Sequence, residues 1–150
     1  MKWITRQRPR IDRLACPWLI ARFIDDDPEF LYVPATKVLP LAATTGAIPF
    51  DVAGVELGHV GELCSFDAFL RKYGLCQPAL ARLASIVRGA DTGRLELAPE
   101  AAGLDALSSG LVRVFPDDHE LLQHGLVMYE ALYAWCETQR SSAFAFEAGG

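Results

Sequence analysis

Apolar residues recur at helical spacing in the first long segment of the chain. Between Ile11 and Phe23 they fall three and four residues apart, which indicates an amphipathic helical unit. Pro17 lacks an N–H and is tolerated best in a first helical turn, so the alternative is a helix over 17–25 alone, with 11–16 as an ordered lead-in. At 100° per residue, Arg22 falls inside the apolar face. An arginine there keeps its charge, so the pattern predicts an anionic partner, either a carboxylate or a ligand.

Three short stretches have the aromatic and β-branched composition that is typical of strands. They are residues 3–6, 30–33 and 47–52, and Pro49 marks the last of them as an edge strand. All three lie within the first 52 residues. The sequence therefore predicts a small sheet near the N-terminus.

The remaining pattern predicts helices. We expect them at 37–45, 66–73, 78–88, 99–114 and from Asp117 to about residue 139. Ser65 is a suitable N-cap for the second, and Gly89 a suitable stop for the third. The sum is an α+β fold, mostly helical, with five or six helices and the small N-terminal sheet. We expect one domain over 1–139, followed by a flexible tail over 140–150.

Charge is distributed unevenly along the chain. The first 22 residues contain six basic residues and a single acidic one, Asp12, whereas the whole chain carries −5. The remainder therefore carries −10. This acidic total argues against direct binding of nucleic acid, which usually needs a broad basic face.

The four cysteines show no Cys-x-x-Cys spacing, and the N-terminus has no apolar core like that of a signal peptide. No apolar run approaches the length of a membrane span. We therefore expect a cytoplasmic protein with reduced thiols and no membrane insertion.

Five stretches of the sequence form a distinctive set. They are IDRLACPWLIARFID from Ile11, FLYVP from Phe30, AIPFD from Ala47, ELGHVGELCSFDAF from Glu56 and ALYAWC from Ala131. The motifs Asp-Arg-x-x-Cys-x-Trp-Leu and His-x-Gly-x-x-Cys-x-Phe are distinctive in combination. Over roughly residues 2–136, the set resembles the C-terminal domain of the bacterial chromate resistance protein ChrB.

The resemblance implies a cytosolic role in chromate resistance, often beside a chromate efflux transporter. Longer members of the family carry an extra N-terminal region and act as chromate-responsive regulators, and some relatives are joined to a rhodanese-type sulfurtransferase domain. This sequence contains neither region, so a DNA-binding role that depends on the first is not expected of it. The resemblance brings no established catalytic residues.

The first candidate site is a segment that places an imidazole, a carboxylate and a thiol within six residues: His59, Glu62 and Cys64. A thiol just before a helix has its pKa lowered by the helix dipole, so Cys64 is a candidate thiolate. Imidazole with carboxylate is common metal chemistry, and Asp91 and His119 are candidates for further ligands of zinc, iron or manganese. In the alternative structural role, His59 binds its own loop and Cys64 is a small core residue.

The second candidate site is an arginine cluster that consists of Arg6, Arg10, Arg13 and Arg22, with Cys16 nearby. Guanidinium groups and a helix N-terminus suit a tetrahedral oxyanion such as chromate or sulfate. A neighbouring thiol could reduce or sense the oxidant. The alternative is a set of salt bridges to the acidic remainder of the chain.

The sequence thus leaves three hypotheses open. The leading one is a cytosolic accessory or sensor domain of chromate resistance that binds an oxyanion, a metal ion or both. The second is a metal-dependent enzyme, a hydrolase or oxidoreductase, built on His59, Glu62, Asp91 and His119. The third is a structural partner module in which a helix face with Tyr133 and Trp135 seats another subunit, as in a homodimer.

Overall fold

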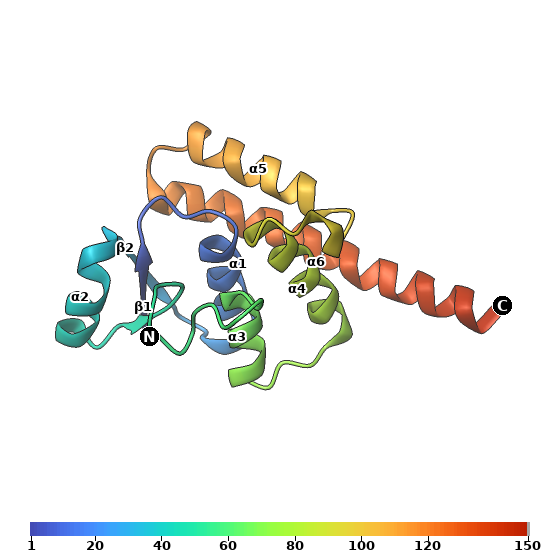
Figure 1. Cartoon of the computed structure of the whole chain (residues 1–150), viewed down its shortest axis with the longest axis horizontal. Helices are drawn as coiled ribbons and strands as arrows, with labels where there is room; N and C mark the ends of the chain where they lie inside the picture. The colour runs from blue at the N-terminus through green and yellow to red at the C-terminus, as the bar shows by residue number, and fades with distance from the viewer. Residues whose placement is uncertain (150) are drawn as a thin grey trace.

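The computed structural model describes the backbone of residues 1–149 and the side chains of residues 1–139. In this part of the chain, a small parallel sheet lies at one end and six α-helices form the rest (Figure 1). The predicted α+β class with a small N-terminal sheet is confirmed. The side chains of the segment that we expected to be a flexible tail, 140–150, lie outside the described residues.

The sheet has the strand order β2-β1-β3, and both pairs are parallel. Its strands are β1 (Lys2–Arg6), β2 (Glu29–Val33) and β3 (Ile48–Pro49). The third is shorter than the predicted 47–52, because the chain turns away at Asp51, whose φ is +52°. Parallel pairing brings the carboxyl ends of all three strands to one edge of the sheet. Arg6 therefore lies beside the residues that follow β3.

Helix α1 (Asp12–Leu19) begins before Pro17 and contains it. A proline in a helix leaves the carbonyl four residues earlier without its backbone donor, and here that carbonyl belongs to Arg13. The hydroxyl of Tyr32, on β2, donates to the Arg13 carbonyl over 3.3 Å. This bond from the sheet satisfies the orphaned group, so the helix passes through the proline.

A π-helical turn, η1 (Ile20–Ile24), follows α1 and changes the rotation per residue. The prediction that Arg22 lies inside the apolar face is consequently wrong, because its side chain is 46% exposed. Its Nε lies 3.3 Å from Glu130 Oε1, and its guanidinium packs over the rings of Phe23 and Tyr133. The predicted anionic partner exists, and it is a carboxylate of the chain itself.

The other helices agree with the sequence pattern apart from their ends. They are α2 (Val38–Thr45), α3 (Ser65–Lys72), α4 (Pro78–Asp91), α5 (Ala101–Val114) and α6 (Asp118–Gly149), with 3-10 turns η2 (Ala35–Lys37) and η3 (Leu95–Leu97). The N-cap of α3 is Cys64, not Ser65, and Asp67 completes a capping box with it.

Helix α4 continues two residues beyond Gly89, where we expected it to stop. A Cβ at Gly89 would lie 2.9 Å from the Arg94 carbonyl oxygen and 3.0 Å from the Ala101 Cβ. This glycine therefore allows the chain after α4 and the start of α5 to approach the helix closely. The extension carries Asp91 to the last position of α4.

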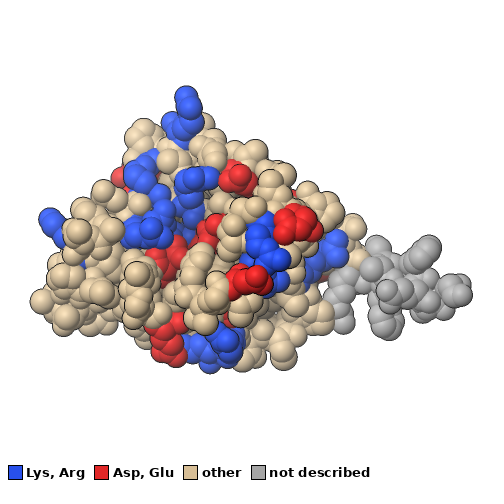
Figure 2. Space-filling view, viewed as in Figure 1, with Lys and Arg blue, Asp and Glu red and all other residues tan. Residues whose placement is uncertain are grey.

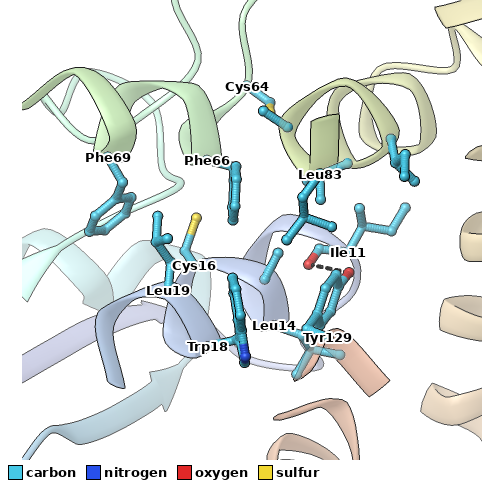
Figure 3. Close-up of a cluster of buried hydrophobic side chains, with 14 of the residues drawn as sticks. Ile11, Leu14, Cys16, Trp18, Leu19, Cys64, Phe66, Phe69, Leu83 and Tyr129 are labelled. Carbon is cyan, nitrogen blue, oxygen red and sulfur yellow. Dashed lines mark hydrogen bonds between the residues drawn. The ribbon is translucent and has the colours of Figure 1, made fainter. Parts of the chain in front are cut away.

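The main core surrounds α1, which packs against α3, α4 and α6 (Figures 1 and 3). Tyr129, on α6, is fully buried and its hydroxyl donates to the Ile11 carbonyl over 3.0 Å. Ile11 has a φ of +42°, which is unusual for a β-branched residue. This bond and the core contacts hold the turn that leads into α1. None of the helices in the described part of the chain combines the length and apolar character that a membrane crossing requires.

Candidate functional site

Asp12, the first residue of α1, is fully buried and links two helices. Its Oδ2 accepts the Ser65 backbone N–H over 2.7 Å, and its Oδ1 accepts the Phe66 N–H over 3.0 Å. These donors belong to the first turn of α3, where backbone N–H groups have no partner within the helix. Burial is the main cause that raises the pKa of Asp12.

Asp51 follows β3 and is also buried, with a side chain 6% exposed. Its Oδ1 accepts the Ser65 hydroxyl over 2.7 Å, and its Oδ2 lies 3.2 Å from Arg6 Nη2. Burial opposes the charged form of Asp51. Hydrogen bonds from His59 and Ser65, with the charges of Arg6 and Arg13, outweigh that cost and lower its pKa.

His59 lies in the loop before α3 and brings a third acid into the group. Its Nε2 is 2.9 Å from Asp91 Oδ2, 3.3 Å from Asp51 Oδ1 and 3.4 Å from Asp12 Oδ2. The three acids come from the start of α1, the turn after β3 and the end of α4. We call Asp12, Asp51, His59 and Asp91 the acidic-histidine cluster.

The acidic-histidine cluster has more acceptors than its imidazole can satisfy. Nε2 carries at most one proton, which can point at only one of the three carboxylates. Hydrogen bonds to Asp12 and Asp51 are the main causes that raise the pKa of His59 to about 10. Burial, followed by the charges of Asp12 and Asp51, raises the pKa of Asp91 to about 7. The group therefore holds protons that isolated side chains would release near neutral pH.

The spacing of the same atoms suits a metal ion. One ligand atom each from Asp12, His59 and Asp91 can be chosen so that all lie within 4.8 Å of one another. Ligand atoms about 2.0–2.2 Å from a tetrahedral ion are separated by about 3.3–3.6 Å. The distances from His59 to Asp91 and Asp12, 2.9 and 3.4 Å, bracket the start of that range. Small side-chain shifts would therefore admit an ion.

Two of the four candidate arginines reach the cluster, and both do so through Asp51. Arg6 donates from Nε to the Asp51 carbonyl over 3.1 Å and contacts the carboxylate through Nη2. Arg13 Nε lies 3.9 Å from Asp51 Oδ2 and has no hydrogen-bond partner among the described residues. Burial, followed by the neighbouring charge of Arg6, lowers the pKa of Arg13.

A cavity of about 770 Å³ opens beside the cluster. Its lining combines Arg6, Asp51 and His59 with residues of η2, α2 and the loop after β3: Ala35, Leu39, Val52, Ala53 and Gly54. The His59 side chain is 43% exposed, so the cluster is accessible from one side. Figure 2 shows acidic residues set among arginine and lysine residues in the middle of this face, between the regions of α2 and α4.

The other candidate residues lie elsewhere. Arg10 contacts Asp105 and Ser109 on α5, and Arg22 contacts Glu130 on α6, as described above. Glu62, 81% exposed, pairs with Arg94 over 3.1 Å. His119 packs edge-on against the ring of Tyr32. Of the residues that we expected to bind metal, the structure thus brings together His59 and Asp91. Of the four arginines, it brings together Arg6 and Arg13.

Both candidate thiols are buried beside carboxylates. Cys16 donates from Sγ to Asp12 Oδ1 over 3.5 Å, and Cys64 donates to Asp67 Oδ2 over 3.3 Å. Burial, followed by the charge of Asp12, raises the pKa of each thiol. The expectation of a lowered pKa at Cys64 is wrong. Desolvation and neighbouring acids outweigh the dipole of α3 at that position.

Asp12 and Asp51 were missing from our sequence-based site. Their signals were present, since both belong to stretches that resemble the family, IDRLAC and AIPFD. Asp51 also lies near the end of the predicted strand 47–52. The carboxyl ends of parallel strands are a common location for ligand-binding residues, so this position is a signal for a site. Strands this short carry no local signal that distinguishes parallel from antiparallel pairing.

The helix face that we considered as a partner surface is largely internal. Tyr129 and Tyr133 are buried in the core. Trp135 instead lines an apolar groove of about 500 Å³ between α5 and α6, with Leu104, Leu107, Met128 and Leu132 among its neighbours. The stripe along α6 therefore serves mainly to pack the helix onto the domain.

Comparison with known proteins gives two matches. The family model described as "ChrB, C-terminal domain" matches residues 3–136. "Protein ChrB" of Cupriavidus metallidurans is 34% identical over 140 residues, which are 93% of this chain and 42% of that protein. The chain thus spans less than half the length of this relative. No solved structure shows a significant match. The family match covers nearly all of the described domain, so this chain belongs to the family of the ChrB C-terminal domain.

Proposed function

We propose that this chain is a metal-binding domain of cytosolic chromate resistance, and that Asp12, His59 and Asp91 hold a divalent ion. The link to chromate rests on the family. The metal rests on the acidic-histidine cluster. In this proposal, Asp51 orients the site through Ser65 and Arg6, and it faces the ion from the cavity side.

One observation carries the proposal: a single imidazole nitrogen faces three carboxylates that come from separate parts of the chain. Buried acids repel one another, and one of these, Asp12, is fully desolvated. A divalent ion would replace the one proton on Nε2 and serve all the surplus acceptors at once. A purely structural ion pair would need only one acid.

The chemistry of the donor atoms limits which metal ions the site could bind. Carboxylate oxygens and an imidazole nitrogen suit manganese, iron(II) or zinc. A thiolate site is disfavoured, because the thiols of Cys16 and Cys64 already donate to carboxylates and have raised pKa values. Calcium and magnesium would leave the imidazole unused as a ligand.

An oxyanion held by four arginines has less support. Arg10 and Arg22 are engaged on α5 and α6, and the other two already share Asp51. A dianion such as chromate or sulfate would bind Arg6 directly beside the Asp51 carboxylate, whose charge repels it. We therefore propose the metal, and not a free oxyanion, as the ligand of the cluster.

Calorimetric titration of chelator-treated protein with Mn²⁺ and Zn²⁺ tests this function. We expect one binding site in the wild type, and affinity lower by at least about tenfold in His59→Ala. His119→Ala is the matched control, because His119 packs against Tyr32 away from the cluster. Equal affinity in the wild type and His59→Ala would reject the proposal.

A metal-dependent hydrolase is a second candidate, and the exposed side of His59 favours it. Catalytic metal sites keep one position open to water or substrate, and the cavity meets the cluster on that side. The test is metal-dependent cleavage of p-nitrophenyl acetate and p-nitrophenyl phosphate. Turnover that disappears in His59→Ala would support an enzyme. Rates equal to free metal in buffer would reject it and leave the binding function in place.

A further inference from the structure

The cavity beside the acidic-histidine cluster is far larger than a bare tetrahedral oxyanion. Its volume is about 770 Å³. A water takes about 30 Å³ of liquid, so a five-atom oxyanion takes on the order of 100 Å³. Pockets for small organic molecules have volumes of about 300–1,000 Å³. By size, the cavity suits an organic ligand.

The lining is divided into a charged end and an apolar wall. Arg6, Asp51 and His59 form the charged end, and the wall includes Leu39 and Val52. Leu39 is 49% exposed, although it is a large apolar side chain at the start of α2. An amphipathic ligand with one polar head would match this division, and would cover Leu39.

Arg6 offers a free donor at the charged end. Its Nε and Nη2 are held by Asp51, whereas Nη1 has no hydrogen-bond partner among the described residues. The side chain is 42% exposed. The guanidinium is therefore fixed in position by one edge and can bind an anionic head with the other.

Charge balance favours a head with one negative charge. A divalent ion and the guanidiniums of Arg6 and Arg13 together exceed the three carboxylates of the cluster by one positive charge, with His59 neutral as a ligand. One monoanion neutralises the site. A dianion such as sulfate or chromate would leave an excess negative charge beside buried acids.

We propose that this cavity binds a small organic monocarboxylate, with its carboxylate on Arg6 at the edge of the metal cluster and its apolar body against Leu39 and Val52. The charge argument rests on the proposed metal function. The arguments from the size of the cavity and from the division of its lining are independent of the metal. The binding of a carboxylate can therefore be tested with and without metal.

The experiment is a ¹H–¹⁵N NMR titration of the full chain with acetate, butyrate and hexanoate, in metal-free and Mn²⁺- or Zn²⁺-loaded protein. Zn²⁺ is used for spectra and Mn²⁺ for line-broadening. We expect affinity to rise about threefold to fourfold for each methylene added. We also expect shifts at the amides of Leu39 and Val52, and tighter binding to the metal-loaded form.

Two pairs of variants locate the ligand. Leu39→Ser should weaken hexanoate by about fivefold, whereas Leu107→Ser, at another exposed leucine on α5, should not change it. Arg6→Gln should weaken all three carboxylates by about tenfold, whereas Arg10→Gln should not. Circular dichroism establishes that each variant is folded.

The outcomes separate the two proposals. A flat response to chain length, binding that ignores Leu39 and Arg6, or tighter binding of sulfate and chromate than of hexanoate would overturn the carboxylate site. Failure of Mn²⁺ and Zn²⁺ to bind would overturn the metal function alone. Hexanoate binding that still depends on Leu39 and Arg6 would then uphold the cavity.

Discussion

Asp12 Oδ2 accepts a 2.7 Å hydrogen bond from the backbone N–H of Ser65, 53 residues further along the chain. This bond ties the start of α1 to the start of α3. The same oxygen lies 3.4 Å from His59 Nε2, so it belongs both to the core and to the candidate site. The stability of the domain and the proposed metal binding are therefore linked at one carboxylate.

Replacement of Asp12 should destabilise the fold as well as the site. Asp12→Ala removes the acceptor for two buried N–H groups, of Ser65 and Phe66, and we expect a loss of about 3 kcal/mol in the free energy of unfolding. Asp12→Asn keeps one carbonyl acceptor, so it should lose less stability than Asp12→Ala but should still have a lower metal affinity. Guanidinium unfolding measures the stability of both variants, and calorimetric titration measures their metal affinity. An Asp12→Ala protein as stable as wild type would contradict the capping role.

The metal-free protein should lose stability as the pH rises from about 6.5 towards about 10. The raised pKa of His59, about 10, means that the folded state holds a proton which the unfolded state releases near 6.5. The stabilising contribution of protonated His59 is complete below pH 6.5, the pKa in the unfolded state, and is lost as the pH rises through the folded-state pKa of about 10. Asp91 acts in the same direction between about 3.8 and about 7, since its pKa is also raised. Urea unfolding at about pH 6, 8 and 9.5 measures the effect in the upper window.

His59→Gln is the control for that pH dependence. Glutamine keeps a donor but does not titrate, so the decline above about pH 7 should flatten. A wild-type slope in His59→Gln would show that another group causes the decline. Metal affinity should change with pH in the opposite direction to the stability of the metal-free protein. It should rise over the same window, because His59 must lose its proton to bind the ion.

Arg8 should be the most important arginine for stability, although we did not select it from the sequence. Its guanidinium donates to the carbonyls of Val112, Phe115 and Pro116 at the end of α5 and pairs with Asp118 at the start of α6. We expect Arg8→Ala to lose about 2–3 kcal/mol in the free energy of unfolding.

The control for Arg8 is Arg10→Ala, in which the lost pair with Asp105 is exposed on both sides. We expect that variant to change the free energy of unfolding by no more than about 0.5 kcal/mol. Similar losses in the two variants would argue that Arg8 acts only as a surface charge.

Gly89→Ala should lower both stability and metal affinity. Its Cβ would lie 2.9 Å from the Arg94 carbonyl oxygen, so backbone must move near the end of α4, which carries Asp91. We expect a loss of about 1–3 kcal/mol. Gly110→Ala on α5 is the matched control. A Cβ there meets no described atom within 4 Å, and helix propensity favours alanine by up to about 1 kcal/mol. Equal stability of the two variants would contradict the close approach at Gly89.

Much of the fold follows from local signals. The aromatic and β-branched stretches became strands, and Gly46 ends α2 in the left-handed conformation that glycine adopts readily. Asp117 accepts the N–H of Glu120 at the start of α6, close to the predicted start of that helix. These features depend on residues only a few positions apart, so periodicity and capping rules can find them.

The sequence-based predictions are wrong where contacts between residues far apart in the chain determine the structure. Pro17 is accommodated within α1 because Tyr32, on strand β2, supplies the missing donor. Gly89 does not end α4 but lies within it, where the absence of a side chain lets the chain after the helix pack closely. The arginines looked like an oxyanion site because their partners, Asp51, Asp105 and Glu130, lie 38 or more positions away. No local rule predicts such pairings.

In our proposal, a divalent ion binds among Asp12, His59 and Asp91. Anomalous diffraction at the metal edge, from crystals grown with Mn²⁺ or Zn²⁺, tests it most directly. We expect one strong peak about 2.0–2.3 Å from His59 Nε2 and from carboxylate oxygens of Asp12 and Asp91. A saturated crystal with no peak there, and with His59 still hydrogen-bonded to the acids, would contradict it.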